Sequence, residues 1–267
     1  MAPDPTPATS DSLQLEAYGL YCALVRCVTN VNNQKAEPSL GGKLLYAGEL
    51  DARGRAMVIA GNVSGCAILA ATADLAVQKL VIRDGVVDFV ITSLDEALRI
   101  LKNEVRKCAT VAVCVAAAPS VVEREMVERG VLPDLVLEGL PGEPRDVPDF
   151  GSGTCGVQTT VPDDDLAFVT WKVGGSPARW MAKLDAIALE RLSSDWQARR
   201  WIRFSPRYCG RSAQAQRVLY CGRDSANEII RRFGAHVQDG EIDAEVLANV
   251  IIGGEIEKFR WSPVRRA

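Results

Sequence analysis

The stretch Gly41-Gly-Lys-Leu-Leu-Tyr-Ala-Gly48, followed by Ile59-Ala-Gly-Asn-Val-Ser-Gly65, sets the fold class. Residues 43–47 predict a short strand that ends at a glycine turn. Residues 55–69 predict a helix that runs into a second strand at 67–72. Neither strand shows strict alternation of apolar and polar residues, which is typical of parallel strands covered on both faces. Strand, turn, helix and strand in this order predict the opening of a βαβ unit.

The alternation of strand and helix continues downstream. The clearest helix begins at Ser93, whose hydroxyl is placed to accept the amide near Glu96 while Glu96 reaches back. A second helix covers residues 121–129 and is closed by Gly130. Three more strands are predicted, at residues 86–91, 110–116 and 135–137. We therefore expect an α/β fold with a doubly wound, Rossmann-like parallel sheet.

The amino-acid composition divides the chain into four parts. Residues 1–10 are rich in Pro and Ser and predict a disordered tail, and 11–140 predict a helix followed by the Rossmann-like domain. Residues 141–165 are rich in Gly, Pro and Asp and predict a linker or a large surface loop. Residues 166–267 predict a smaller C-terminal α/β portion. Its expected elements are a strand at 166–173, a helix capped by Ser176, short strands at 201–204 and 218–220, a helix at 225–233 and an apolar segment at 246–252.

Composition narrows the function classes. The chain has 267 residues, 48% of them hydrophobic, so it can bury a substantial core. A net charge of −3 with interspersed signs, and 6% aromatic residues, give no footprint for nucleic acid or an anionic membrane. No apolar run approaches the roughly 18 residues of a membrane span. We expect a cytoplasmic protein with neither nucleic-acid nor membrane partners.

The cysteines and the single histidine do not predict a metal site. None of the eight cysteines forms a C-x-x-C pair, and most lie in apolar runs, which favours reduced, buried thiols. His236 follows a basic pair near a helix end and is interpreted as a surface or capping residue. Cys209 and Cys221 flank an Arg-rich stretch that would lower a thiol pKa, although a structural role is favoured. Asp185 is interpreted as part of a solvated helix surface.

A literal G-x-G-x-x-G motif occurs at Gly151, Gly153 and Gly156. A phosphate cradle needs these glycines between a strand and a helix, so that helix amides point at the pyrophosphate. The flanking segments predict neither a strand before the motif nor a helix after it. We interpret the motif as a flexible glycine loop.

Together with Ser93-Leu-Asp-Glu-Ala-Leu-Arg-Ile-Leu-Lys102 and Arg129-Gly-Val-Leu-Pro-Asp134, the two opening stretches resemble the central domain of urocanase. Further segments between residues 183 and 253 are similar to the part of urocanases that leaves the cofactor domain. The resemblance implies a Rossmann-like fold, membership of a lyase family of histidine catabolism, and NAD+ as the cofactor that polarises the substrate.

The residues at the implied cofactor positions depart from the family pattern. The glycine-rich loop begins at Gly48, but its close-approach positions become Asp51, Ala52 and Arg53, with only Gly54 surviving. Asp51 would repel phosphates, and Arg53 would offset it in part. The acidic residue that would hold the ribose falls at Thr72. The family's polar residues after the fourth and fifth strands become the pair Ala117 and Ala118 and the run Glu138-Gly-Leu-Pro-Gly142. We therefore expect no NAD+ cofactor.

Three hypotheses for the function remain open. The first is a urocanase-like homodimer that lacks a complete catalytic apparatus and binds a small anionic ligand or a partner, with Arg53 as its positive group. The second is a hydro-lyase of altered substrate whose site combines Arg53, the 139–165 loop and Cys155. The third is a structural subunit beside a separate catalytic chain. In an open parallel sheet the ligand crevice lies outside the carboxyl ends of the strands, so the site is expected at residues 48–54 and in the 139–165 loop.

Overall fold

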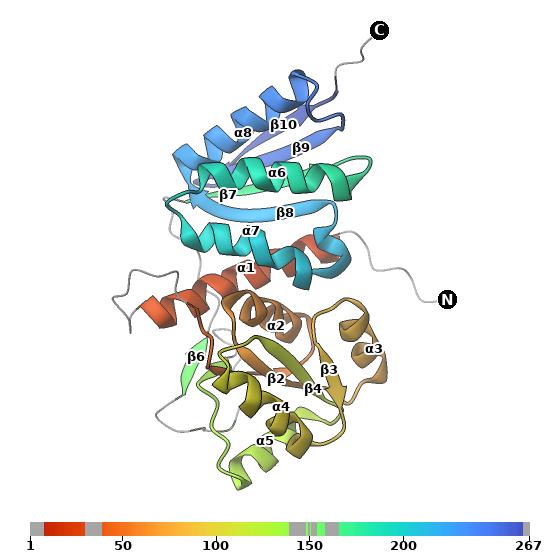
Figure 1. The fold of residues 1–267 in the computed structure, drawn as a ribbon, viewed down its shortest axis with the longest axis vertical. Helices are drawn as coiled ribbons and strands as arrows, with labels where there is room; N and C mark the ends of the chain where they lie inside the picture. Colours follow the sequence, from red (N-terminus) through yellow and green to blue (C-terminus); the bar gives the residue numbers. More distant parts are fainter. Residues whose placement is uncertain are drawn as a thin grey trace. The chain divides into compact units, whose positions relative to one another are not determined.

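The computed structural model describes residues 8–29, 39–138, 148, 150, 154–157 and 166–263. The chain divides into two compact units, Met1–Thr160 and Val161–Ala267, and each unit contains one sheet (Figure 1).

The sheet of the N-terminal unit has six strands in the order β3-β4-β2-β1-β5-β6. Every pair of neighbouring strands is parallel. The central strands β2 and β4 are buried along their whole length, as continuous apolar runs in a doubly covered sheet should be. The strands are β1 (Leu44–Glu49), β2 (Ala67–Ala71), β3 (Phe89–Ile91), β4 (Val111–Val115), β5 (Leu135–Leu137) and β6 (Cys155–Val157).

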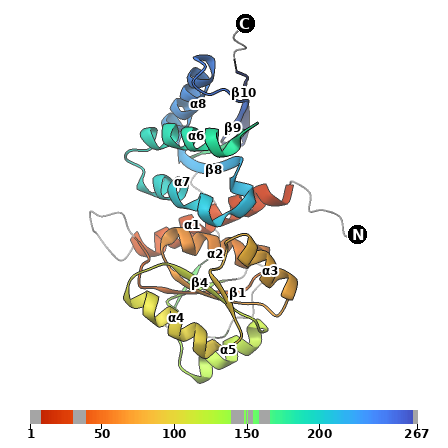
Figure 2. The ribbon, with the colours of Figure 1, turned by 45° about the vertical axis from the view of Figure 1, so that its right-hand side comes forward.

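Helices cover both faces of this sheet, which confirms the doubly wound, Rossmann-like arrangement. The five helices are α1 (Ala8–Thr29), α2 (Ala52–Ser64), α3 (Leu75–Arg83), α4 (Leu94–Arg106) and α5 (Pro119–Glu128). Figures 1 and 2 show α1 and α2 on one face and α4 and α5 on the other. One core cluster joins alternate strand residues such as Leu69 and Val113 to Leu98 and Leu101 of α4 and Met126 of α5.

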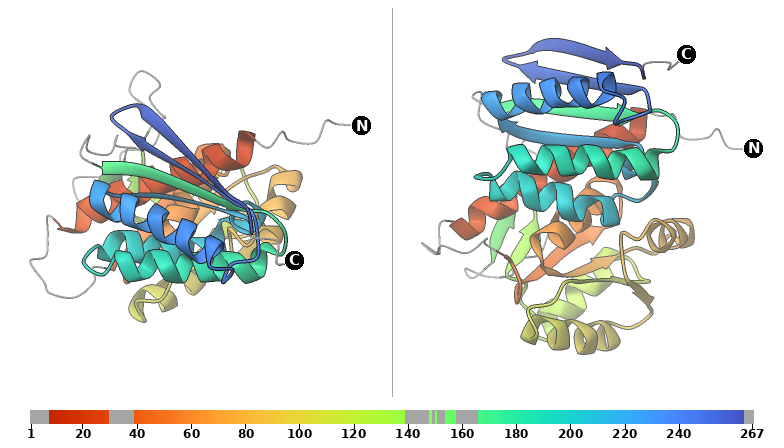
Figure 3. Two further views of the ribbon diagram at one scale, coloured as in Figure 1. Left: turned by 90° about the horizontal axis from the view of Figure 1, so that it is seen from above. Right: turned by 45° about the horizontal axis from the view of Figure 1, so that its top comes forward.

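The C-terminal unit is built on an antiparallel sheet of four strands in the order β10-β9-β7-β8. Its strands are β7 (Leu166–Val173), β8 (Gln216–Gly222), β9 (Val246–Ile252) and β10 (Glu255–Trp261). Its helices are α6 (Pro177–Arg191), α7 (Trp196–Tyr208) and α8 (Arg223–Gln238), with a short 3-10 helix at Gly210–Ala213. The three α-helices lie on one face of the sheet (Figure 3). Trp171 of β7 and Phe233 of α8 meet beneath them with ring centroids 5.5 Å apart.

Several predicted elements need correction. The tail predicted over residues 1–10 is wrong from Ala8 onward, because α1 begins there; residues 1–7 lie outside the described chain. Strand β6 lies within the segment 141–165 that was predicted to be a loop. The strand predicted at 201–204 is wrong, because these residues belong to α7. Helix α3 and strand β10 were not predicted.

The start of α4 lies at the predicted residue but without the predicted capping bond. Ser93 is the N-cap in extended conformation, and its side chain makes no capping hydrogen bond. The acidic residues Asp95 and Glu96 still occupy the first turn, where negative charge is favourable near the helix amides. The apolar stripe of Leu94, Ala97, Leu98 and Leu101 is buried as predicted. Packing of this stripe therefore places the helix.

Candidate functional site

The strand order of the N-terminal unit reverses direction between β1 and β5, which is where an open parallel sheet is expected to form its ligand crevice. From β1 the chain crosses first to β2 on one side, and it later returns to β5 on the other side of β1. Helices that leave neighbouring strands in opposite directions open a crevice at the carboxyl ends of those strands. Residues 48–54 follow β1, and Glu138 follows β5. The segment 48–54 therefore reaches this edge of the sheet, whereas most of the 139–165 loop lies outside the described residues.

The two predicted glycines of the β1–α2 turn have structural roles. Gly48 has a φ of +70°, and the pairing of β1 with β2 shifts register between Tyr46 and Gly48. A Cβ on Gly54 would overlap the carbonyl oxygen of Glu49, so only glycine lets α2 begin this close to β1. The surviving glycines thus bring a helix N-terminus against the strand, as a phosphate cradle requires.

Asp51 occupies the N-terminus of α2. It is the N-cap residue, and its Oδ1 accepts a hydrogen bond from the amide of Gly54 at 2.7 Å. A carboxylate of the chain itself therefore lies where the helix amides would otherwise meet a bound anion. From the sequence we predicted that Asp51 lies in this loop and repels phosphate. We did not predict its capping role, although Asp directly before a helix is a strong capping signal.

Arg53 is also engaged by the fold. One guanidinium nitrogen donates to the carbonyl oxygen of Glu138, the residue after β5, at 3.3 Å. The other lies 3.7 Å from Glu16 Oε1 on α1, and the Arg53 side chain is only 15% exposed. Burial raises the pKa of Glu16, and the charge of Arg53 opposes that rise. An incoming anion would thus compete with Glu16 and with a backbone carbonyl for Arg53.

Thr72 directly follows β2 and is fully buried. Its Oγ1 accepts from the amide of Asp74 at 3.2 Å, and its carbonyl oxygen accepts from the side-chain amide of Gln78 at 3.0 Å. Asp74 in turn caps α3, accepting from the amide of Ala76 at 2.7 Å. The nearest carboxylate to the expected ribose position is therefore another helix cap.

The glycine motif at 151–156 is not a strand-to-helix turn at its described end. Gly156 lies in the edge strand β6, and a Cβ there would overlap the carboxyl group of Glu138. Gly151 and Gly153 lie outside the described residues. Ala118 caps α5 without a side-chain hydrogen bond.

The cysteines differ in their surroundings. Cys155 is exposed at the start of β6, and its sulfur lies 3.3 Å from that of Cys27 on α1. Burial raises the pKa of both Cys209 and Cys221 to about 12. At Cys209 the charge of Arg217 opposes this rise but does not overcome it. Burial therefore dominates the pKa of both thiols, and the structural role is favoured.

Asp185 of the C-terminal unit is a buried ion pair rather than a solvated surface group. Its Oδ2 accepts from two nitrogens of Arg217, at 2.8 and 3.2 Å, and the two side chains are 14% and 7% exposed. Burial raises the pKa of Asp185 to about 6 in spite of Arg217. Arg217 also donates to the carbonyl oxygens of Ala213 and Gln216. The pair fastens α6 to β8.

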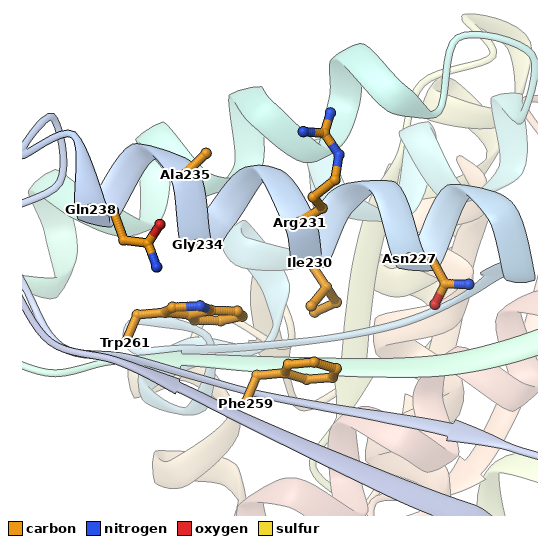
Figure 4. Close-up of a pocket in the computed structure, with 8 residues that line it drawn as sticks. All are labelled: Asn227, Ile230, Arg231, Gly234, Ala235, Gln238, Phe259 and Trp261. Carbon is orange, nitrogen blue, oxygen red and sulfur yellow. The ribbon is translucent and has the colours of Figure 1, made fainter.

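The C-terminal unit also holds an open pocket of 560 Å³ between α8 and β10 (Figure 4). Phe259 and Trp261 form its floor, with near-parallel rings whose centroids are 5.7 Å apart. Gly234 lets the helix approach, because a Cβ there would lie 2.6 Å from Trp261 Nε1. Asn227 and Gln238 stand at the two ends of the floor (Figure 4). The pocket thus combines a flat aromatic surface with two amide groups.

His236 lies in the last turn of α8, with its Nδ1 2.8 Å from Glu241 Oε2. Within the described residues, no cluster of three or more His, Cys, Asp or Glu side chains could hold a metal ion. None of the described helices is both long and apolar enough to cross a lipid bilayer.

Comparison with known families bears on the N-terminal unit. Residues 21–139 match the family model of the urocanase Rossmann-like domain. The matched region runs from α1 through β5 and includes the turn at 48–54 and Thr72. The resemblance seen in the sequence is confirmed over this region.

Proposed function

With a urocanase-like Rossmann domain as the premise, we propose that this chain is a binding protein that has lost NAD+-dependent hydration. The main support for this proposal is the hydrogen bond that the Gly54 amide donates to the Asp51 carboxylate at the N-terminus of α2. A dinucleotide pyrophosphate binds by accepting such amides, and a second negative charge at this place would be repelled. The residues present do not fit NAD+.

The remaining polar groups of the crevice support the same proposal. Arg53 is held by Glu16 and by the carbonyl of Glu138, and Thr72 is buried beneath the Asp74 cap. A lyase of altered substrate built on Arg53 would first have to break these contacts. We therefore place ligand binding in the C-terminal unit rather than in the crevice.

The pocket between α8 and β10 suits a planar heteroaromatic ligand. Aromatic rings stack on flat ligands, and the amides of Asn227 and Gln238 supply both donors and acceptors at the edge of such a ring. Arg231 is held by Glu228 through two contacts of 2.7 and 2.8 Å, so its charge is largely neutralised. Because the negative charge of Glu228 is paired with Arg231, a planar ligand that carries a carboxylate would meet little net repulsion in this pocket.

The test uses the full chain with NAD+, urocanate and imidazole acids as probes in a thermal-shift and calorimetry screen. A ligand at 100 times its dissociation constant stabilises a protein by about 2.7 kcal/mol. We expect no shift and no heat with NAD+, and no decay of urocanate absorbance with added protein. NAD+ retained at one equivalent through purification, or turnover proportional to protein concentration, would overturn the loss of hydration.

Variants separate the two binding places. Phe259→Ala should abolish the shift caused by a planar probe, whereas Phe168→Ala, a ring on the opposite face of the same sheet, should leave it unchanged. Arg53→Glu in the crevice should also leave probe binding unchanged. Loss of binding in Arg53→Glu with retention in Phe259→Ala would return the ligand to the crevice.

We further propose that the chain forms a homodimer through the β3 edge of its parallel sheet. Leu75 and Ile82 of α3 and Phe89 of β3 are exposed, and α3 packs beside β3. Large exposed apolar side chains that gather at one edge are typical of association surfaces. Light scattering should give twice the chain mass, and Ile82→Glu should give the monomer mass. A monomer in the unmodified protein would contradict the proposal.

A further inference from the structure

Two cysteine thiols distant in the sequence lie side by side in the N-terminal unit. The sulfur atoms of Cys27 and Cys155 are 3.3 Å apart, although 128 positions separate the residues. Cys27 lies in the last turn of α1, and Cys155 is the first residue of the edge strand β6. A disulfide bond is about 2.05 Å long, so closing this contact needs a movement of only about 1 Å.

The two thiols differ in access to solvent. Cys155 is exposed and Cys27 is half-buried. Burial, followed by the hydrogen bond with Cys155, raises the pKa of Cys27 to about 12. An oxidant in solution therefore meets Cys155 first, and the Cys27 sulfur lies 3.3 Å from the sulfur that is oxidised, close enough to resolve it.

We propose that Cys27 and Cys155 form a peroxide-sensitive dithiol site that closes into a reversible disulfide. The Cys155 sulfur attacks hydrogen peroxide and becomes a sulfenic acid, releasing one water. The Cys27 sulfur then attacks the sulfenic sulfur, the S–O bond breaks, and a second water leaves as the S–S bond forms. The two thiols lose two electrons and two protons in total, and peroxide is reduced to two waters. A small thiol or dithiol reductant reverses the reaction by exchange.

The disulfide would add a covalent link where the fold already has a polar one. Arg53 joins Glu16 of α1 to the carbonyl of Glu138 at the end of β5, and β6 pairs with β5. The short strand β6 has only three residues, so the bond would fasten it to α1 and fix this edge of the sheet. Oxidation should therefore raise the melting temperature of the N-terminal unit.

The experiment treats the reduced full-length chain with a small excess of hydrogen peroxide. Thiols titrated after denaturation should fall from eight to six, and the intact mass should fall by that of two hydrogen atoms. Digestion without reductant should yield one linked pair of peptides containing Cys27 and Cys155. Dithiothreitol should restore eight thiols and the original melting temperature.

Cysteine variants provide the controls. Cys27→Ser should show no mass loss and should instead carry a sulfenic acid on Cys155 that dimedone traps, whereas Cys155→Ser should form no linked pair and should keep the Cys27 thiol. Cys108→Ser removes another exposed thiol and should behave like the unmodified protein. A linked pair that contains any other cysteine, eight thiols retained after peroxide, or covalent dimers as the sole product would overturn the proposal.

Discussion

The two units use opposite kinds of sheet, and the difference decides where each has room for a ligand. The parallel sheet of the N-terminal unit is buried on both faces, so its binding opportunity is the crevice at the strand ends. The antiparallel sheet of the C-terminal unit carries helices on one face, and β7 alternates buried and partly exposed residues. Its pocket opens between the edge strand β10 and α8.

The comparison separates a Rossmann-like scaffold from the side chains at its helix N-termini. Asp51 accepts a hydrogen bond from the Gly54 amide at the N-terminus of α2, and Asp74 accepts one from the Ala76 amide at the N-terminus of α3. The C-terminal pocket is instead lined by two near-parallel rings beneath α8. Fold and binding capacity are therefore separate properties of this chain.

Gly54 gives the largest expected effect, and it tests how tightly the N-terminal unit is built around β1. Gly54→Val places a side chain onto the carbonyl oxygen of Glu49, which is backbone and cannot move aside. The free energy of unfolding should fall by more than about 4 kcal/mol, or the protein should fail to fold. Urea denaturation measures this change. Gly174→Ala is the matched control in the C-terminal unit, because the nearest atom to its Cβ lies 3.6 Å away.

Trp171 tests the one-sided layering of the C-terminal unit. It is fully buried beneath the helices against Phe233, so Trp171→Ala should cost about 3 kcal/mol of unfolding free energy. Phe168 is on the opposite, partly exposed face of the same strand, so Phe168→Ala should cost about 1 kcal/mol. Equal losses in denaturant titrations would show that both faces are covered alike.

The Asp185 ion pair predicts a pH dependence of the stability of the C-terminal unit. Burial raises the pKa of Asp185 from 3.8 to about 6, so the folded state binds a proton more readily than the unfolded state between these values. The free energy of unfolding should therefore fall by about 2 kcal/mol as the pH rises from about 4 to about 6. Asp185→Asn should remove this part of the slope in denaturant titrations at several pH values.

Glu228 supplies the control of opposite sign. This exposed carboxylate binds Arg231 and Arg232, and these hydrogen bonds lower its pKa to about 2. Its contribution to stability is present above its ordinary pKa of 4.5 and is lost as the pH falls toward 2. Glu228→Gln should therefore leave the slope between pH 4.5 and 6 unchanged. A slope that persists in Asp185→Asn would place the titrating group elsewhere.

The secondary structure of periodic or continuous apolar segments was predictable from the sequence. That of short aromatic runs and of highly charged segments was not. Residues 111–115 and the stripe of α4 follow their patterns directly. The run at 201–204 indicated a strand because it is short and aromatic, but Asp195 caps a helix in which Ala198, Trp201 and Ile202 share one buried face. Strand β10 is largely exposed and rich in charge, so only the Gly253-Gly254 turn signalled its hairpin.

The position of the turn after β1 was predictable from the sequence, but the contacts made by its side chains were not. The sequence placed Asp51 and Arg53 at the end of β1, because a strand followed by a glycine turn and a helix fixes that edge. The capping bond of Asp51 and the contact of Arg53 with Glu138 depend on tertiary distances. The thiol pair of Cys27 and Cys155 has no local signal at all, since 128 positions separate its members.

The smallest expected effect compares two caps within the N-terminal unit, and it tests whether the crevice is closed by Asp51. Asp51→Ala removes the hydrogen bond to the Gly54 amide and should cost about 1 kcal/mol of unfolding free energy. Ser93→Ala removes a hydroxyl without a capping bond and should cost less than about 0.5 kcal/mol. Denaturant titrations at pH 7 give both values. If Ser93→Ala cost as much as Asp51→Ala, the capping box at Ser93 and Glu96 would form in solution. If Asp51 occupies the N-terminus of α2 in solution, Asp51→Ala must cost more unfolding free energy than Ser93→Ala, because only Asp51→Ala removes a hydrogen bond to a helix amide.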